Sequence, residues 1–217
     1  MPSFKLTSRV RWSDAGSAPL DIRASHYHIG MVEILFGKGS PDKKTTSLHI
    51  AAKNGELLLD STLSKGRTGV MDLLFITSNT SIDARDKDNN TPLHVAALRG
   101  HIGIVDLLLS QGASIGAIGQ FTYTPLHFAA RGGHTGIVEL LLQKGAPIET
   151  KTRSDYTPLH LAAYNGHSNT VKLLLDKGAS IEAKNSARQT PLQIAENHHR
   201  RESIRLLKNK AAELGRG

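Results

Sequence analysis

The chain has 217 residues, a formal net charge of +8 at pH 7, 39% hydrophobic residues and no cysteine. This length suits one or two compact domains or one elongated repeat array. The lack of cysteine excludes a disulfide scaffold and any mechanism that needs a cysteine nucleophile or metal ligand. No apolar run approaches the roughly 18 residues of a membrane span, and the first residues lack the apolar core of a secretory signal. The positive charge favours acidic partner surfaces but does not identify nucleic acid.

The N-terminal residues differ in pattern from the rest of the chain. Residues 4–12 alternate apolar and polar side chains, which is typical of a short half-buried strand. We therefore predict a separate strand or cap segment at residues 1–17 that covers the open end of the structure behind it. The alternative is that this strand pairs with a flanking domain or a partner.

A seven-residue cassette recurs through the rest of the chain. Residues 91–97 read Thr-Pro-Leu-His-Val-Ala-Ala, close copies begin at 124 and 157, and a weaker copy begins at 190, so each starts 33 residues after the one before. A fixed period of this size indicates stacked supersecondary units. The threonine can cap a helix N-terminus, and proline suits the first helical position. The spacing thus predicts a helix at each cassette, a glycine stop, a second leucine-rich helix and an extended loop.

The cassette and its period resemble the ankyrin repeat. The resemblance implies an all-α solenoid of stacked helix-turn-helix units with short β-hairpin loops. We predict a single ankyrin-repeat domain over residues 18–217, with repeats that start near residues 18, 46, 91, 124, 157 and 190. The second repeat carries an insert at residues 56–66, which is either a tolerated loop insertion or a distinctive contact patch.

Individual helices can be placed within this plan. In the repeat that begins at 124, we expect a first helix over about 125–131, a stop at two glycines, and a second helix over 135–143. In the last repeat, Gln193 replaces the histidine and the second helix, over 202–212, carries basic residues. A polar cap at the end of the stack is the expected role of this repeat.

The repeated polar residues of the cassette are assigned to structure. The histidine can bond the threonine side chain and nearby backbone, and so tie one repeat to the next. Histidines one repeat apart lie roughly 10 Å from each other by helix packing distance, which is too far for a shared metal ion. We expect no metal and no cofactor. The structural residues are Thr91, Pro92, His94, Thr124, Pro125, His127, Thr157, Pro158 and His160.

Binding specificity is expected from residues that differ between equivalent repeats. The ankyrin resemblance implies a partner on the concave face, which hairpin tips and the ends of first helices form. Tyrosine and arginine are enriched at binding hot spots, and both occur in this set. The alternative is that the tip aromatics pack on adjacent hairpins and stiffen the array. The predicted partner-binding residues are Lys87, Asp88, Asn90, Leu98, Arg99, Gln120, Phe121, Tyr123, Arg131, Arg153, Ser154, Tyr156, Tyr164 and Asn165.

These features predict a non-catalytic scaffold that holds a segment of another protein, preferably an acidic one, in repeats three to five. None of the hydrolase, nucleotide-binding or metalloprotease motifs occurs in the sequence, so we expect no enzyme activity and no small-molecule substrate. We expect a monomer in the cytoplasm or nucleus, with delivery by a microbe into a host cell left open. Two alternatives are binding of nucleic acid, phosphate or membrane through basic terminal patches, and a targeting fragment of a larger enzyme or channel.

Overall fold

The structure is a computed structural model, and it describes Ala52 and residues 81–215. The predicted segment at 1–17, the repeat near 18, the insert at 56–66 and all but Ala52 of the second cassette lie outside the described residues. The repeats that start near 91, 124, 157 and 190 lie within them. The fold and the candidate site are therefore described from these four repeats.

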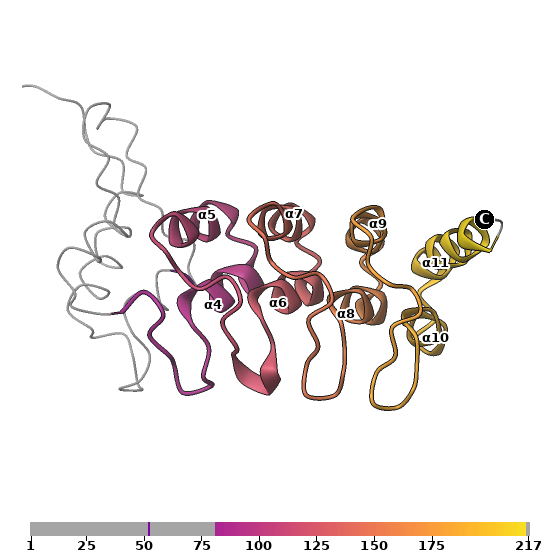
Figure 1. Cartoon of the computed structure of the whole chain (residues 1–217), viewed down its shortest axis with the longest axis horizontal. Helices are drawn as coiled ribbons and strands as arrows, with labels where there is room; N and C mark the ends of the chain where they lie inside the picture. Colours follow the sequence, from indigo (N-terminus) through magenta and orange to yellow (C-terminus); the bar gives the residue numbers. More distant parts are fainter. Residues whose placement is uncertain (1–51, 53–80, 216–217) are drawn as a thin grey trace, which may run out of the picture.

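Each of the four repeats contributes a pair of antiparallel helices. The pairs are α4 (Pro92–Arg99) and α5 (Ile102–Ser110), α6 (Pro125–Gly132) and α7 (Thr135–Gln143), α8 (Pro158–Asn165) and α9 (Ser168–Asp176), and α10 (Pro191–Asn197) and α11 (Arg201–Leu214). The first helices form one row, the second helices form another, and the loops project beyond the first row (Figure 1). The predicted all-α ankyrin solenoid is confirmed.

The helix boundaries follow from the cassette. A threonine in extended conformation precedes each first helix, and proline occupies its first turn. Gly100, Gly133 and Gly166 end the first three of these helices with φ of 84°, 73° and 77°, a left-handed conformation that glycine adopts without steric cost. The helix over 135–143 has its predicted bounds, while the last helix begins one residue earlier and ends two residues later than predicted.

The core runs continuously through the stack. The cassette leucines Leu93, Leu126 and Leu159 are at most 1% exposed, and the alanine pairs that follow them are fully buried. Small alanine side chains let successive first helices approach closely, while the leucines fill the space between rows. Each fully buried leucine contributes about 2 kcal/mol of hydrophobic stabilisation. Because the same positions recur in every repeat, this core specifies the stacking and carries little partner specificity.

The loops that project from the first row end in tight turns, which we call fingers. The fingers are residues 86–90, 119–123, 152–156 and 185–189, and in each the first N–H donates to the carbonyl of the fifth residue at 2.7–3.1 Å. They have the expected hairpin shape (Figure 1), but their arms form no regular strand within residues 81–215. Short 3-10 helix η1 (Gln120–Thr122) forms the tip of finger 119–123.

Candidate partner-binding groove

The cassette histidines connect each first helix to the next finger. Nδ1 of His127 accepts the backbone N–H of Thr124 at 3.2 Å, and its Nε2 lies 3.0 Å from the carbonyl oxygen of Tyr156. Because Nδ1 accepts, the ring proton is on Nε2, which donates to that carbonyl. His94 makes the equivalent bond to the carbonyl of Tyr123, also at 3.0 Å. The histidines therefore position the fingers.

These histidines are neutral at pH 7. Burial lowers the pKa of His94 and His127 to about 4, and it also lowers the pKa of His160. Hydrogen bonds to backbone carbonyls oppose the shift but do not cancel it. A neutral ring that already uses both nitrogens within the fold is suited to structural support. The chemistry of partner binding must come from other residues.

Two adjoining hollows lie in the middle repeats: the larger is lined by fingers and first helices, and the smaller by fingers 119–123 and 152–156 alone. The larger, of about 360 Å³, is lined by Phe121, Tyr123, Arg131, Tyr156, Leu161, Tyr164 and Asn165. The smaller, of about 170 Å³, is lined by Phe121, Tyr123, Thr152, Arg153, Ser154 and Tyr156. Three aromatic residues are common to both. We call the combined surface the aromatic groove.

The rings of the groove divide into a more buried pair and a more exposed pair. Tyr123 is partly buried and its ring centroid lies 5.3 Å from that of Phe128, while Tyr156 packs 5.7 Å from His160. Phe121 is 64% exposed and Tyr164 is 40% exposed. Tyr123 and Tyr156 therefore both stiffen the array and line the groove. Phe121 and Tyr164 therefore expose more surface, although the Tyr164 ring also packs 4.1 Å from the ring of His198.

One arginine accompanies each hollow. Arg131, at the end of α6, lines the larger one, and Arg153, in finger 152–156, lines the smaller one. Both are exposed, and neither forms an ion pair within residues 81–215. Burial raises the pKa of Tyr123, while the positive charge of Arg131 opposes that rise. The guanidinium of Arg131 therefore acts on the aromatic centre of the groove.

Six of the predicted residues lie outside the groove: Lys87, Asp88, Asn90, Leu98, Arg99 and Gln120. Four of them connect repeats instead. The side-chain amide of Gln120 donates to the carboxylate of Asp88 at 3.4 Å. The side-chain oxygen of Asn90 accepts the backbone N–H of Gln120 at 3.1 Å, and the carbonyl of Leu98 accepts from His134 at 2.9 Å. Lys87 and Arg99 are exposed.

Finger 119–123 depends on that bond from Asn90. In the other fingers the side chain of the first residue accepts the N–H of the fifth: Asp86 at 2.8 Å, Thr152 at 3.1 Å and Asn185 at 2.8 Å. Gly119 has no side chain to do so. A Cβ at Gly119 would lie 2.5 Å from the side-chain oxygen of Asn90, so the neighbouring finger occupies that space. Asn90 accepts the N–H of Gln120 there, while the N–H of Tyr123 donates to the carbonyl of Gln120 at 3.0 Å.

Two groups of residues were missed by the sequence interpretation. Leu161 and Thr152 line the groove although they are only 5% and 6% exposed. The cassette position of Leu161 suggested stacking alone. Side chains just before α7, α9 and α11 form a second set of bonds between repeats. Nε2 of His134 bonds the carbonyl of Leu98, Nε2 of His167 bonds the carbonyl of Arg131, and Nε of Arg200 bonds the carbonyl of Tyr164. Their 33-residue spacing was available as a signal.

The basic residues of the last helix are mostly paired. Arg205 bonds Glu202 at 3.0 Å, Lys208 bonds Glu196 at 3.0 Å, and Lys210 bonds Glu213 at 3.2 Å. Exposed ion pairs of this kind contribute little to stability, but each places a carboxylate beside a cation. The local positive potential that the sequence suggested is therefore reduced. Among residues 81–215, no helix is both long and apolar enough to cross a membrane.

Comparison with known proteins agrees with this architecture. A family model of ankyrin repeats (3 copies) matches residues 20–117, 63–152 and 147–216. The chain belongs to the ankyrin-repeat family. Members of this family generally act in protein–protein interaction and are generally non-catalytic.

Similarity to curated proteins is confined to part of the chain. The chain is 36% identical over 74 residues to alpha-latrotoxin-Lt1a of Latrodectus tredecimguttatus, across 34% of this chain and 5% of the toxin. It is 38% identical over 66 residues to ankyrin repeat domain-containing protein 49 of Homo sapiens, across 30% of this chain and 28% of that protein. The chain thus spans less than a third of either relative.

Proposed function

We propose that this chain is a non-catalytic interaction module that binds an extended, acidic segment of another protein in the aromatic groove. The observation that carries the proposal is that most of the predicted binding residues lie together on one surface. Eight residues that differ between repeats, and that were selected from sequence alone, line one continuous surface. They are Phe121, Tyr123, Arg131, Arg153, Ser154, Tyr156, Tyr164 and Asn165.

The composition of the groove suits a peptide better than a small molecule. Exposed aromatic and arginine side chains are the residue types that dominate binding energy in protein interfaces. The hollows are open and shallow, with volumes of about 360 and 170 Å³, whereas drug-sized ligands are usually enclosed on most sides. Arg131 and Arg153, which form no ion pair within residues 81–215, supply positive charge that complements carboxylates on the partner.

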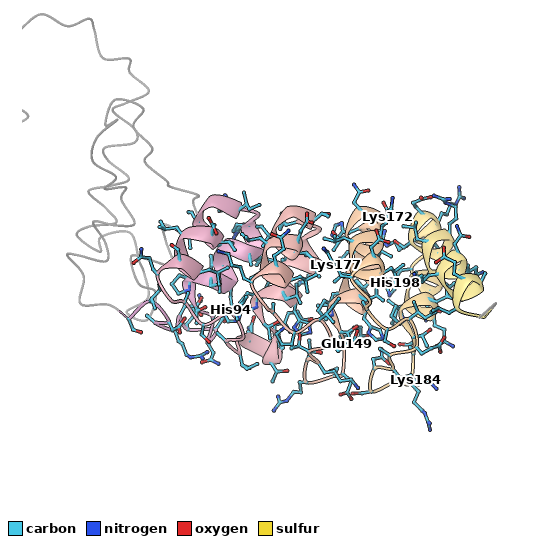
Figure 2. The ribbon with its side chains drawn as sticks, turned by 45° about the horizontal axis from the view of Figure 1, so that its top comes forward. His94, Glu149, Lys172, Lys177, Lys184 and His198 are labelled. Carbon is cyan, nitrogen blue, oxygen red and sulfur yellow. The ribbon has the colours of Figure 1, made fainter. Side chains whose placement is uncertain are left out.

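The test is partner capture with a groove variant and a matched control. The groove variant combines Arg131→Glu and Tyr164→Ala, two exposed positions outside the hydrophobic core. Tyr164→Ala also removes the ring contact with His198. The control combines Lys172→Glu and Ile102→Ala, which make a similar change of charge and apolar area on second helices. Lys172 lies on the α9 side of the stack, away from Lys184, which directly precedes finger 185–189 (Figure 2).

We expect wild type and control to capture the same proteins from a cell extract, and the groove variant to lose them. Circular dichroism and thermal unfolding of all three proteins check that the fold is unchanged. Capture of the same proteins by the groove variant would reject this site. Binding through the basic C-terminal helix is less favoured, because three of its cations, Arg205, Lys208 and Lys210, are paired with carboxylates.

A further inference from the structure

Finger 119–123 differs from the other fingers in its backbone. In the three others only the fourth residue has positive φ: Asn89, Asp155 and Arg188. In finger 119–123, both Phe121 and Thr122 have positive φ, of 55° and 62°, and the N–H of Tyr123 donates to the carbonyl of Gln120 at 3.0 Å. This is the arrangement of a type I′ turn, which normally selects glycine, asparagine or aspartate.

Neither phenylalanine nor the β-branched threonine suits that turn. Surrounding bonds hold it: the N–H of Gly119 donates to the carbonyl of Tyr123 at 2.7 Å, and the N–H of Arg153 donates to the carbonyl of Phe121 at 3.3 Å. Residues held in unfavourable backbone conformations cluster at functional sites. Here the result is a phenylalanine that lines both hollows and is 64% exposed.

Each of the two arginines lines a different hollow, and the aromatic centre is shared by both hollows. Phe121, Tyr123 and Tyr156 line both hollows, whereas Arg131 lines only the larger and Arg153 only the smaller. No acidic residue lines either hollow. A bound segment that spans the groove therefore meets positive charge, then apolar surface, then positive charge.

We propose that the bound segment carries an apolar side chain between two carboxylates. The apolar side chain packs against Phe121, Tyr123 and Tyr156, and the carboxylates pair with Arg131 and Arg153. This proposal rests on the proposed function and specifies its ligand. An extended peptide advances about 3.3 Å per residue, so each carboxylate lies within a few residues of the apolar side chain. Single-stranded nucleic acid fits less well, because it brings a phosphate at every nucleotide to a groove with two arginines.

Selection from a displayed library of random dodecapeptides tests the pattern, with the full chain as bait. Wild type is expected to enrich aspartate or glutamate on both sides of leucine, isoleucine, methionine or phenylalanine. Arg131→Glu should convert one acidic flank to lysine or arginine and leave the other acidic, and Arg153→Glu should convert the opposite flank. Lys172→Glu, on the second-helix face, should change neither. Phe121→Ala should weaken the best wild-type peptide at least tenfold.

Other outcomes would overturn the proposal. Groove-dependent peptides without flanking acids, or acidic flanks that survive both charge reversals, would reject this ligand and leave the proposed function standing. Recovery only of peptides that bind every groove variant equally would reject both. Binding of a fluorescent oligothymidylate that is lost on Phe121→Ala, with no enriched acidic peptide, would assign the groove to nucleic acid instead.

Discussion

His127 donates its Nε2 proton to the backbone carbonyl of Tyr156 across 3.0 Å, so an invariable part of one repeat holds a variable part of the next. His94 holds Tyr123 in the same way. Two of the rings that line the groove are thus positioned by residues whose pattern first indicated only stacking. Under the proposed function, stability and recognition share these bonds, and conditions that break them should affect both.

Acid should destabilise the array through these histidines. The folded-state pKa of His94 and His127 is about 4, below the ordinary value of about 6.5 for an unfolded chain. The unfolded state therefore binds more protons between these values, so stability is complete above pH 6.5 and falls as the pH drops towards 4. Each histidine contributes up to about 1.4 kcal/mol per pH unit within that window. Urea unfolding between pH 7 and 4 measures the slope.

His127→Gln provides the matched control for that titration. The last repeat already uses glutamine at this position, where Gln193 accepts the N–H of Thr190 at 2.9 Å. The variant should lose about 1 kcal/mol at pH 7 with the bond to Tyr156, and its stability should depend less steeply on pH. An unchanged slope would show that carboxylates, not His127, govern the acid response.

Thr122→Gly should stabilise the protein. A non-glycine residue in the left-handed region costs about 1–2 kcal/mol, and Thr122 has φ of 62°. Glycine removes that cost but loses part of the gain to greater freedom in the unfolded chain, so we expect a net gain of about 1 kcal/mol by urea unfolding. Thr122→Ala retains a Cβ and should show a smaller effect. Equal stability of the two variants would mean that this turn carries no strain at residue 122.

His199→Gly should also stabilise the protein. His199 has φ of 55° and falls at the register of Gly133 and Gly166, which end the preceding first helices. Its side chain is exposed, so its loss removes no core packing. We expect a gain of about 1 kcal/mol, or roughly 2–4 °C in Tm, by calorimetry. His199→Ala, which keeps the Cβ, should give no such gain, and a lower Tm for the glycine variant would reveal a stabilising role of the imidazole.

Gly119→Ala should destabilise the protein without any conflict of backbone conformation. A Cβ there would lie 2.5 Å from the side-chain oxygen of Asn90 and 2.9 Å from Nε2 of His94. Overpacking of this kind typically costs about 1–3 kcal/mol. Gly116→Ala is the control, because nothing lies within 4 Å of a Cβ at Gly116. If both variants unfold at the same urea concentration, the two fingers are not in close contact.

Much of the fold could be predicted because it depends on local, repeated chemistry. Threonine, proline and glycine mark the helix ends wherever they recur, and the predicted second helix over 135–143 has the observed bounds. The convergence of Arg131 and Arg153 on a shared aromatic centre depends on how fingers and helices from different repeats lie in space. Leu161 was missed for the same reason, since a buried position can still form the floor of a groove.

The backbone of finger 119–123 was beyond sequence reasoning. Phe121 and Thr122 are unfavourable residue types for the turn that they form, and backbone hydrogen bonds from Gly119 and Arg153 hold it in place. Residue types along the chain do not reveal hydrogen bonds that distant segments form with this turn.

The hydrogen bond that Asn90 accepts from Gln120 also limits the order in which these repeats can be combined. An array built by cutting the chain at cassette boundaries would place residues 119–123 beside a different neighbour. Without an asparagine at the register of Asn90, the transplanted loop would keep its amino acids and lose the acceptor for the N–H of Gln120. The order of the repeats therefore determines how finger 119–123 is held. Grafts from this protein should carry finger 86–90 together with finger 119–123.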